Sequence, residues 1–177
     1  DSSPESERLA RLLAQGSGVE PLLEDITAAL SGLGCYTRRD NAIRRVFPDY
    51  AAAAGWRAKI VLPPNLLDEN TLNVFLLTIV QPDGTEETRP LPAAEFLQIV
   101  AASNFKQRTR MAMLYHHAEV RHFAVIGTAN KNERDQGFFV KHGDSGVDCD
   151  LLAHLYKTQI YQLAEHLGVP EEIRRRT

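Results

Sequence analysis

Cysteine is scarce in this sequence, and long apolar runs are missing. The 177 residues contain two cysteines, Cys35 and Cys149, which lie far apart and lack the spacing of metal ligands. A disulfide scaffold and a cysteine-bound metal site are therefore not favoured. No apolar run approaches the roughly 18 residues of a membrane span, and no secretory apolar segment stands at the start. We expect a cytoplasmic protein in a reducing compartment, without a membrane partner.

An excess of charge of one sign is also lacking. The net charge is -3 at pH 7, with 44% hydrophobic and 24% charged residues. This balance gives no reason to expect a nucleic-acid partner, and it suits one globular domain with a sizeable core. The one dense basic cluster, 174–176, is typical of a solvated helix face. Because the sequence opens at Asp1 and stops within a charged run, we expect it to be part of a longer chain.

Helix signals open the chain, and strand signals follow. The run "SSPESERLARLLAQG" predicts a helix with Ser3 as its N-cap, Pro4 at its first position and Gly16 at its end. The β-rich runs 58–63 and 73–80, the turn "QPDGTE" and the run "TRPLPA" predict a hairpin. Polar Ser103 and Asn104 favour a boundary between the helix "AAEFLQIVAA" and a longer helix after it.

The last third of the chain combines a strand, a loop and a helix. "HFAVIGT" predicts a buried strand that ends at Thr128. "LLAHLYKTQIYQLAEHLGV" predicts an amphipathic helix whose inward residues are Leu155, Ile160, Leu163 and Leu167. This alternation predicts an α/β fold with a mainly parallel sheet flanked by helices.

Residues 137–150, "GFFVKHGDSGVDCD", follow neither a helical nor a strand period. Gly143 and Gly146 permit turns with positive φ. Calcium is not favoured, because the order of the acidic residues differs from that of an EF-hand and no closing glutamate is present. Recognition of a polar organic ligand by hydrogen bonds fits better, and a capped surface loop is the alternative. The charged groups of this loop are Lys141, Asp144, Asp148 and Asp150.

Four residues outside the loop are candidates for ligand contacts. In open α/β sheets ligands bind beyond the carboxyl ends of the strands, where Thr128 stands. Glu133 suits Mg²⁺ near phosphates, or else it is a carboxylate that the helix dipole favours. Arg108 is suited to bind a phosphate or a carboxylate, and Lys157 is suited to stabilise negative charge that develops on phosphates. Taken one by one, each is also an ordinary turn or surface residue.

Four motifs in order resemble the C-terminal half of ammonia-dependent NAD⁺ synthetases, of the N-type ATP pyrophosphatase superfamily. They are "KQRTRM", "VIGTANKNE", "GFFVKHGDSGVD" and "LYKTQIYQLAEHLGVPEEI". The resemblance implies an adenine nucleotide alpha-hydrolase-like (Rossmann-like) fold in a single synthetase domain over 1–177. It also implies a ligase that uses Mg²⁺ and ATP to adenylate deamido-NAD, releases pyrophosphate, and lets ammonia displace AMP to form NAD⁺. A homodimer is the family's usual state.

Site roles follow from this resemblance only, position by position. Thr128 and Lys157 would contact ATP, and Glu133 would bind Mg²⁺. Lys157 would also stabilise the adenylation transition state. Deamido-NAD would be held by Arg108, Lys141, Asp144 and Asp148, with Asp144 at the reacting end as a catalytic residue that orients or deprotonates the incoming ammonium.

Two departures from the family pattern keep alternatives open. The Ser-Gly-Gly-x-Asp-Ser pyrophosphate loop is absent from the sequence, which leaves a non-catalytic nucleotide-binding homologue as one alternative. The range from about 38 to 102 is longer than the family needs, so we predict an insertion that contains the hairpin. Such an insertion favours a second alternative, a related enzyme that amidates a different carboxylate.

Overall fold

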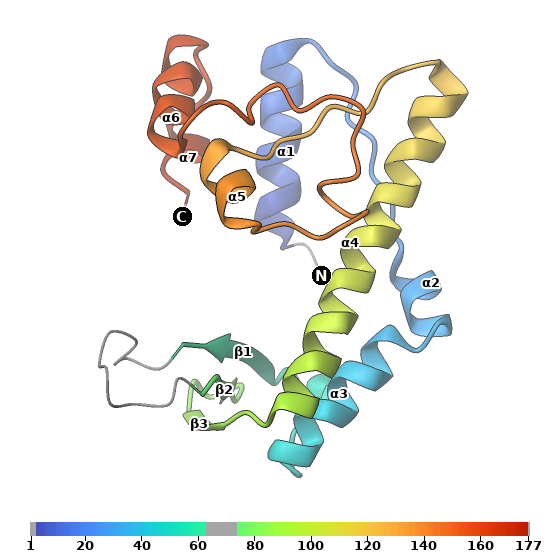
Figure 1. Cartoon of the computed structure of the whole chain (residues 1–177), viewed down its shortest axis with the longest axis vertical. Helices are drawn as coiled ribbons and strands as arrows, with labels where there is room; N and C mark the ends of the chain where they lie inside the picture. Colours follow the sequence, from blue (N-terminus) through green and yellow to red (C-terminus); the bar gives the residue numbers. More distant parts are fainter. Residues whose placement is uncertain (1–2, 63–73, 177) are drawn as a thin grey trace. The chain divides into compact units, whose positions relative to one another are not determined.

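The computed structural model describes residues 3–62 and 74–176. The chain divides into two compact units, one formed by residues 1–28 with 107–177 and the other by residues 29–106 (Figure 1). The second unit contains the predicted insertion, although a single synthetase domain with an insertion at about 38–102 stays a prediction. Within the described ranges, no helix has both the length and the apolar character needed to cross a membrane.

The first unit begins with α1 (Pro4–Ser17), and its start is the one that the sequence predicts. Ser3 is extended, and its side chain accepts a hydrogen bond from the backbone N–H of Ser6 at 3.2 Å. The helix ends at Gly18, which has a φ of 66°, so the prediction of Gly16 as the end was wrong by two residues. A left-handed residue closes a helix well because its N–H can turn back to the last carbonyls.

The second unit is an antiparallel sheet covered by helices. Its strands β1 (Arg57–Val61), β2 (Leu76–Val80) and β3 (Glu86–Pro90) lie in the order β1-β2-β3. β2 and β3 form the predicted hairpin, whose turn places Gly84 at a φ of 89°. The ends of the two predicted runs at Pro63 and Asn73 lie outside the described residues.

The core of this unit lies on one face of the sheet. Leu77 and Ile79 of β2 pack with Ile43 of α3 (Cys35–Val46) and with Phe47 and Tyr50 after it. Ala52–Ala54 form one 3-10 turn after these residues. α2 (Thr27–Gly32) precedes α3 and spans the boundary between the two units.

A single long helix, α4 (Ala93–Arg121), contains the segment where we expect a helix boundary. The predicted break at Ser103 or Asn104 was therefore wrong. Partly buried Phe96 and Ile99 pack against the core of the second unit, whereas Met111 and Ala118 belong to a core cluster of the first. An N-cap contributes about 1 kcal/mol to stability. The helical hydrogen bonds that are kept when the helix continues through Ser103 and Asn104 contribute more than this.

The strand-like segment near residue 126 pairs in parallel, but only briefly. Ile126 forms one parallel bridge with Cys149, and the N–H of Gly127 donates to the carbonyl of Cys149 at 2.7 Å. Val125 is buried, while Ile126 is 49% exposed. The predicted buried strand and mainly parallel sheet were therefore wrong for the described residues, whose three-stranded sheet is antiparallel and whose parallel pairing is this one bridge.

Three short helices complete the first unit: α5 (Lys131–Gln136), α6 (Lys157–His166) and α7 (Glu171–Arg174). Figure 1 shows α6 and α7 beside each other at the red end of the chain, in agreement with their contacts. The predicted amphipathic helix starts at Lys157, because residues 151–155 form turns. Leu163 and Leu167 are 37% and 69% exposed, so their predicted inward orientation was wrong, whereas Leu155 and Ile160 are partly buried.

Candidate functional site

The loop 137–150 is held in shape by its own backbone and side chains. Gly137 closes α5 with a φ of 65°. Asp144 accepts a hydrogen bond from the backbone N–H of Val140 at 2.7 Å, and the hydroxyl of Ser145 donates to the carbonyl of Val140 at 2.9 Å. The loop is therefore a compact series of turns, with Lys141 and Asp144 exposed on its surface.

The glycines of the loop serve a different purpose from the one that the sequence suggests. Neither Gly143 nor Gly146 has a positive φ; beyond Gly137, the loop residue in the left-handed region is His142, at 60°. A Cβ on Gly143 would lie 2.9 Å from Cγ1 of Val140, which is closer than a real contact allows. Gly143 is thus required by close packing, and the positive φ that these two glycines permit is not adopted.

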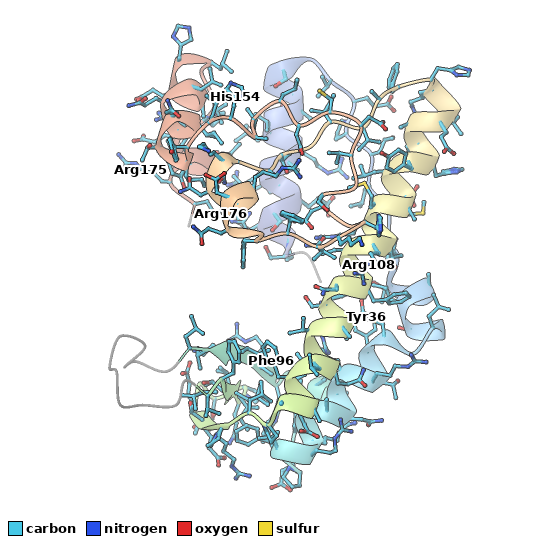
Figure 2. The ribbon with its side chains drawn as sticks, viewed as in Figure 1. Tyr36, Phe96, Arg108, His154, Arg175 and Arg176 are labelled. Carbon is cyan, nitrogen blue, oxygen red and sulfur yellow. The ribbon has the colours of Figure 1, made fainter. Side chains whose placement is uncertain are left out.

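Arg108 and Tyr115 of α4 both contact the loop. Figure 2 labels Arg108 on α4. Nε of Arg108 donates to the carbonyl of Lys141 at 3.0 Å. The hydroxyl of Tyr115 donates to Oδ1 of Asp148 at 2.9 Å, and the other oxygen of Asp148 accepts from the N–H of Val125 at 2.8 Å. Four segments of the first unit are thereby joined: α4, the strand-like segment, and the start and the end of the loop.

These contacts raise the pKa of Tyr115. The hydrogen bond to Asp148 is the main cause, with smaller contributions from desolvation and from the negative charge of Asp148. A phenol that donates to a carboxylate holds its proton more tightly, since ionisation would place two negative groups together. The site therefore has a neutral donor at Tyr115 over the ordinary pH range.

A groove of about 480 Å³ lies between α4 and the loop. Its walls include Arg108, Met111 and Tyr115 from α4, and His142 and Val147 from the loop. The combination of apolar walls with a guanidinium and a few polar groups is typical of a site for an organic ligand that carries an anionic group.

Glu133 occupies the N-terminal turn of α5 and also caps it. Asn130, only 3% exposed, accepts from the N–H of Glu133 at 3.1 Å, and Oε2 of Glu133 accepts from the N–H of Asn130 at 2.9 Å. Mg²⁺ is usually held by one or two protein carboxylates together with phosphate oxygens. Glu133 fits such a role, because one carboxylate already oriented by a hydrogen bond is what this coordination needs. The described residues contain no cluster of three or more metal-ligating side chains.

Thr128 precedes α5 on the chain, and Lys157 is the first residue of α6. Both residues are exposed. The N–H of Lys157 donates to the side chain of Asn132 at 3.2 Å, and the N–H of Lys131 donates to the carbonyl of Leu155 at 2.8 Å. The ammonium of Lys157 lies 5.7 Å from the centre of the Tyr161 ring. The start of α6 is thus docked on α5.

The candidate residues form two groups in the first unit. One group surrounds the loop and the groove, and it comprises Arg108, Lys141, Asp144 and Asp148. The other lies around α5 and comprises Thr128, Glu133 and Lys157. Among the described residues, no side-chain hydrogen bond or ion pair links the two groups directly.

Sequence reasoning missed Tyr115, Asn130 and Arg134. The spacing of Asn130 and Glu133 is a capping-box signature, so that pair was detectable. Tyr115 and Asp148 are 33 residues apart, and no local pattern indicates such a contact.

Likeness to solved structures defines the class of fold first. An NH3-dependent NAD synthetase from Campylobacter jejuni subsp. jejuni NCTC 11168, in complex with the nitrate ion, matches 99% of this chain and 52% of its own, with a TM-score of 0.59 and 21% identity. A glutamine-dependent NAD+ synthetase from Acinetobacter baumannii in complex with ADP matches with the same TM-score and 17% identity, over 99% of this chain and 24% of its own. These likenesses confirm the α/β, adenine nucleotide alpha-hydrolase-like architecture.

The particular family follows from the sequence of the chain itself. The model of the NAD synthase family matches residues 70–177, and the chain belongs to this family. The NH(3)-dependent NAD(+) synthetase of Rhizobium meliloti (strain 1021) is 51% identical over 176 residues, which are 99% of this chain and 52% of that protein. The protein of the same name from Thermotoga maritima (strain ATCC 43589 / DSM 3109 / JCM 10099 / NBRC 100826 / MSB8) is 35% identical over 173 residues, 98% of this chain and 55% of its own. The chain spans about half the length of these relatives.

Proposed function

We propose that this chain is part of an ammonia-dependent NAD⁺ synthetase. The reaction converts deamido-NAD, ATP and ammonia to NAD⁺, AMP and pyrophosphate through an acyl-adenylate. The observation that carries this proposal is the 51% identity over 99% of the chain to a relative named for this activity. The groove between α4 and the loop supports it, because a guanidinium beside apolar walls suits a ligand with an anionic group and a ring.

Adenylation solves the problem that a carboxylate is a poor electrophile. The nicotinate carboxylate attacks the α-phosphorus of ATP, and pyrophosphate leaves. Ammonia then attacks the acyl carbon, and AMP leaves with the bonding electron pair while the amide forms. Most of the catalysis consists of positioning and of stabilising charge on the phosphates.

The group around α5 is proposed to handle ATP. Thr128 contacts ATP, and the exposed ammonium of Lys157 stabilises the charge that develops on the phosphates during adenylation. Glu133 holds Mg²⁺, which supplies neutralisation of phosphate charge when it is bound. The docking of Lys157 on Asn132 supports a shared role, because it keeps the lysine and α5 together.

The group around the loop is proposed to hold deamido-NAD. Arg108, Lys141 and Asp148 bind the dinucleotide, and Asp144 acts at the reacting end, where its exposed carboxylate orients or deprotonates ammonium. Asp144 has capacity for this role, because a carboxylate offers about four acceptor positions and the N–H of Val140 uses one of them. We further propose a cytoplasmic homodimer, the state implied by the resemblance to the family.

A coupled assay of the full-length protein tests the proposal. With ATP, Mg²⁺, ammonium and deamido-NAD, pyrophosphate and NAD⁺ are expected together, and neither is expected when deamido-NAD is omitted. Pyrophosphate release with a different acid only would identify a related enzyme for another carboxylate. Absence of both products with every acid would identify a non-catalytic homologue.

A substitution at Lys157 makes this test specific to the site. Lys157→Met is expected to lower kcat by about 10²–10³-fold, the usual cost of removing one group that stabilises transition-state charge. Lys59→Met is the matched control, because Lys59 lies on β1 in the other unit and pairs with Glu86 at 3.0 Å. Equal losses in the two variants would contradict the role of Lys157.

A further inference from the structure

Asp150, the last residue of the loop, has a buried and incompletely satisfied carboxylate. Its side chain is 14% exposed, and its Oδ2 lies 3.2 Å from Nη2 of Arg134. Among the residues that the structure describes, its Oδ1 is buried without a hydrogen-bond partner. A buried carboxylate is costly unless a cation compensates its charge. The placement of Asp150 therefore depends on Arg134.

The backbone next to Thr128 is shaped around this carboxylate. A Cβ on Gly127 would overlap Oδ1 of Asp150 and would lie 2.7 Å from Cγ2 of Val147. The N–H of Gly127 donates to the carbonyl of Cys149, the residue before Asp150. Asp150 thus packs closely against Gly127, the residue before Thr128, which is a proposed ATP contact.

Arg134 carries the contact from Asp150 to α5. It is the neighbour of Glu133 on this helix of six residues, and its guanidinium carbon lies 5.7 Å from the centre of the Phe139 ring. A helix this short has little stability of its own. Its orientation is therefore set by the Asn130 cap at its start, by the hydrogen bonds of Lys131 and Asn132 to the start of α6 and the turn before it, and by Arg134 near its end.

We propose that Asp150 is a positioning residue which acts through Arg134 to orient α5, and with it Glu133, for the divalent cation that accompanies ATP. This inference rests on the proposed function and extends it to two residues outside the ligand-contacting set. Loss of the carboxylate charge at Asp150 releases Arg134, so α5 no longer presents Glu133 in one orientation. Binding of the cation weakens, while the groove that Arg108 and Tyr115 line keeps its contacts.

The test compares cation binding in the full-length protein with Asp150→Asn, which keeps the shape of the side chain and removes its charge. The probe is Mn²⁺ in the presence of ATP, followed by the loss of the free-Mn²⁺ electron paramagnetic resonance signal. Mn²⁺ affinity is expected to fall about tenfold, as is usual when a group that orients a metal ligand is removed. The KM for deamido-NAD is expected to stay unchanged while the half-saturating concentration of Mg²⁺ rises.

Variants at Arg134 test the same pair from its exposed end. Arg134→Gln is expected to weaken Mn²⁺ binding as Asp150→Asn does, and the double variant is expected to be no worse than either single one. Arg134→Lys is expected to restore part of the affinity. Because the Arg134 side chain is 41% exposed, this series remains informative if Asp150→Asn fails to fold.

Asp135→Asn is the matched control on the same helix. Asp135 pairs with Lys131 at 2.8 Å within α5 and does not link the helix to the loop. Unchanged Mn²⁺ affinity in folded Asp150→Asn or Arg134→Gln would overturn the inference, and so would an equal loss in Asp135→Asn. A wild-type protein that binds Mn²⁺ with ATP but makes no pyrophosphate from deamido-NAD would overturn the proposed function and not the positioning role.

Discussion

The position of Gly127 requires glycine because a Cβ there would overlap neighbouring atoms. Its backbone φ is not positive, so backbone conformation is not the reason. Gly127→Ala would place a methyl group against Asp150 and Val147. We expect a loss of about 1–3 kcal/mol in the free energy of unfolding, the usual cost of overpacking. Urea denaturation of the full-length protein measures it.

Gly16→Ala is the control for this prediction. Gly16 lies inside α1, and an added Cβ there meets no described atom within 4 Å. Alanine should therefore stabilise the helix by about 0.5–1 kcal/mol, because it lowers the backbone entropy of the unfolded chain. If Gly127→Ala left stability unchanged, or raised it as Gly16→Ala is expected to do, the close packing around Gly127 would be disproved.

Tyr115 supplies a prediction in the alkaline range. Its hydrogen bond to Asp148 raises its pKa above the ordinary value of about 10. Because the folded state holds the proton more tightly than the unfolded state, the stability from this bond is fully present below about pH 10. It is lost as the pH rises through the pKa of the folded protein.

Ultraviolet titration of the tyrosines checks this expectation. Tyr115→Phe should remove one late-titrating phenol, and Asp148→Asn should move that phenol to lower pH. Tyr50, whose pKa is also raised, chiefly by burial, should titrate late in all three proteins and serves as the reference. If Tyr115→Phe removed a phenol that titrates at the ordinary pKa and left the late-titrating phenols unchanged, the contact would be contradicted.

At the scale of elements, α4 is where sequence signals and structure differ most. Ser103 is an exposed residue in the interior of this helix. Ser103→Pro should cost about 3 kcal/mol or more, because proline lacks an N–H and its ring clashes with the carbonyl of Ile99. Circular dichroism and urea denaturation measure the loss of helix and of stability.

Ser103→Ala distinguishes a continuous helix from a capped boundary. In a helix interior, alanine is the better helix former, so a small gain is expected. At an N-cap, the same substitution would lose about 1 kcal/mol. A loss of that size in Ser103→Ala would argue that α4 begins anew at Ser103.

Other elements follow their local signals closely. Ser3 and Pro4 start α1 as predicted, and the turn at Gly84 closes the predicted hairpin. In these cases the stabilising contacts join residues only a few positions apart, so the sequence pattern contains them. The predicted start of α6 was wrong, because the periodic apolar residues before Lys157 lie in turns that contact α5.

At the scale of the whole chain, each compact unit has a core of its own. Leu77 is 1% exposed in the core of the unit formed by residues 29–106, and Trp56, the sole tryptophan, packs against that core. Leu77→Ala should cost about 2–5 kcal/mol through lost burial and a residual cavity. Tryptophan fluorescence during urea denaturation reports on this unit.

Leu114→Ala is the comparison for Leu77→Ala. Leu114 is 53% exposed on the part of α4 that belongs to the other unit. Its truncation should change stability by no more than about 0.5 kcal/mol, as is usual at exposed positions. Similar shifts of the fluorescence transition in both variants would show that Leu77 is not a core residue.

The sequence by itself determined the family of the chain, the start of α1 and the turn of the β2–β3 hairpin, and its candidate ligand contacts stay predictions. Motifs of this kind consist of residues close together on the chain, so their meaning does not depend on the remainder of the fold. Only the tertiary structure decided that α4 is continuous and that Asp148 is held by Tyr115 and Val125. It likewise decided that Gly127 makes room for Asp150. These contacts join residues more than twenty positions apart or result from packing between elements, and no local pattern specifies which distant side chain will fill a given space.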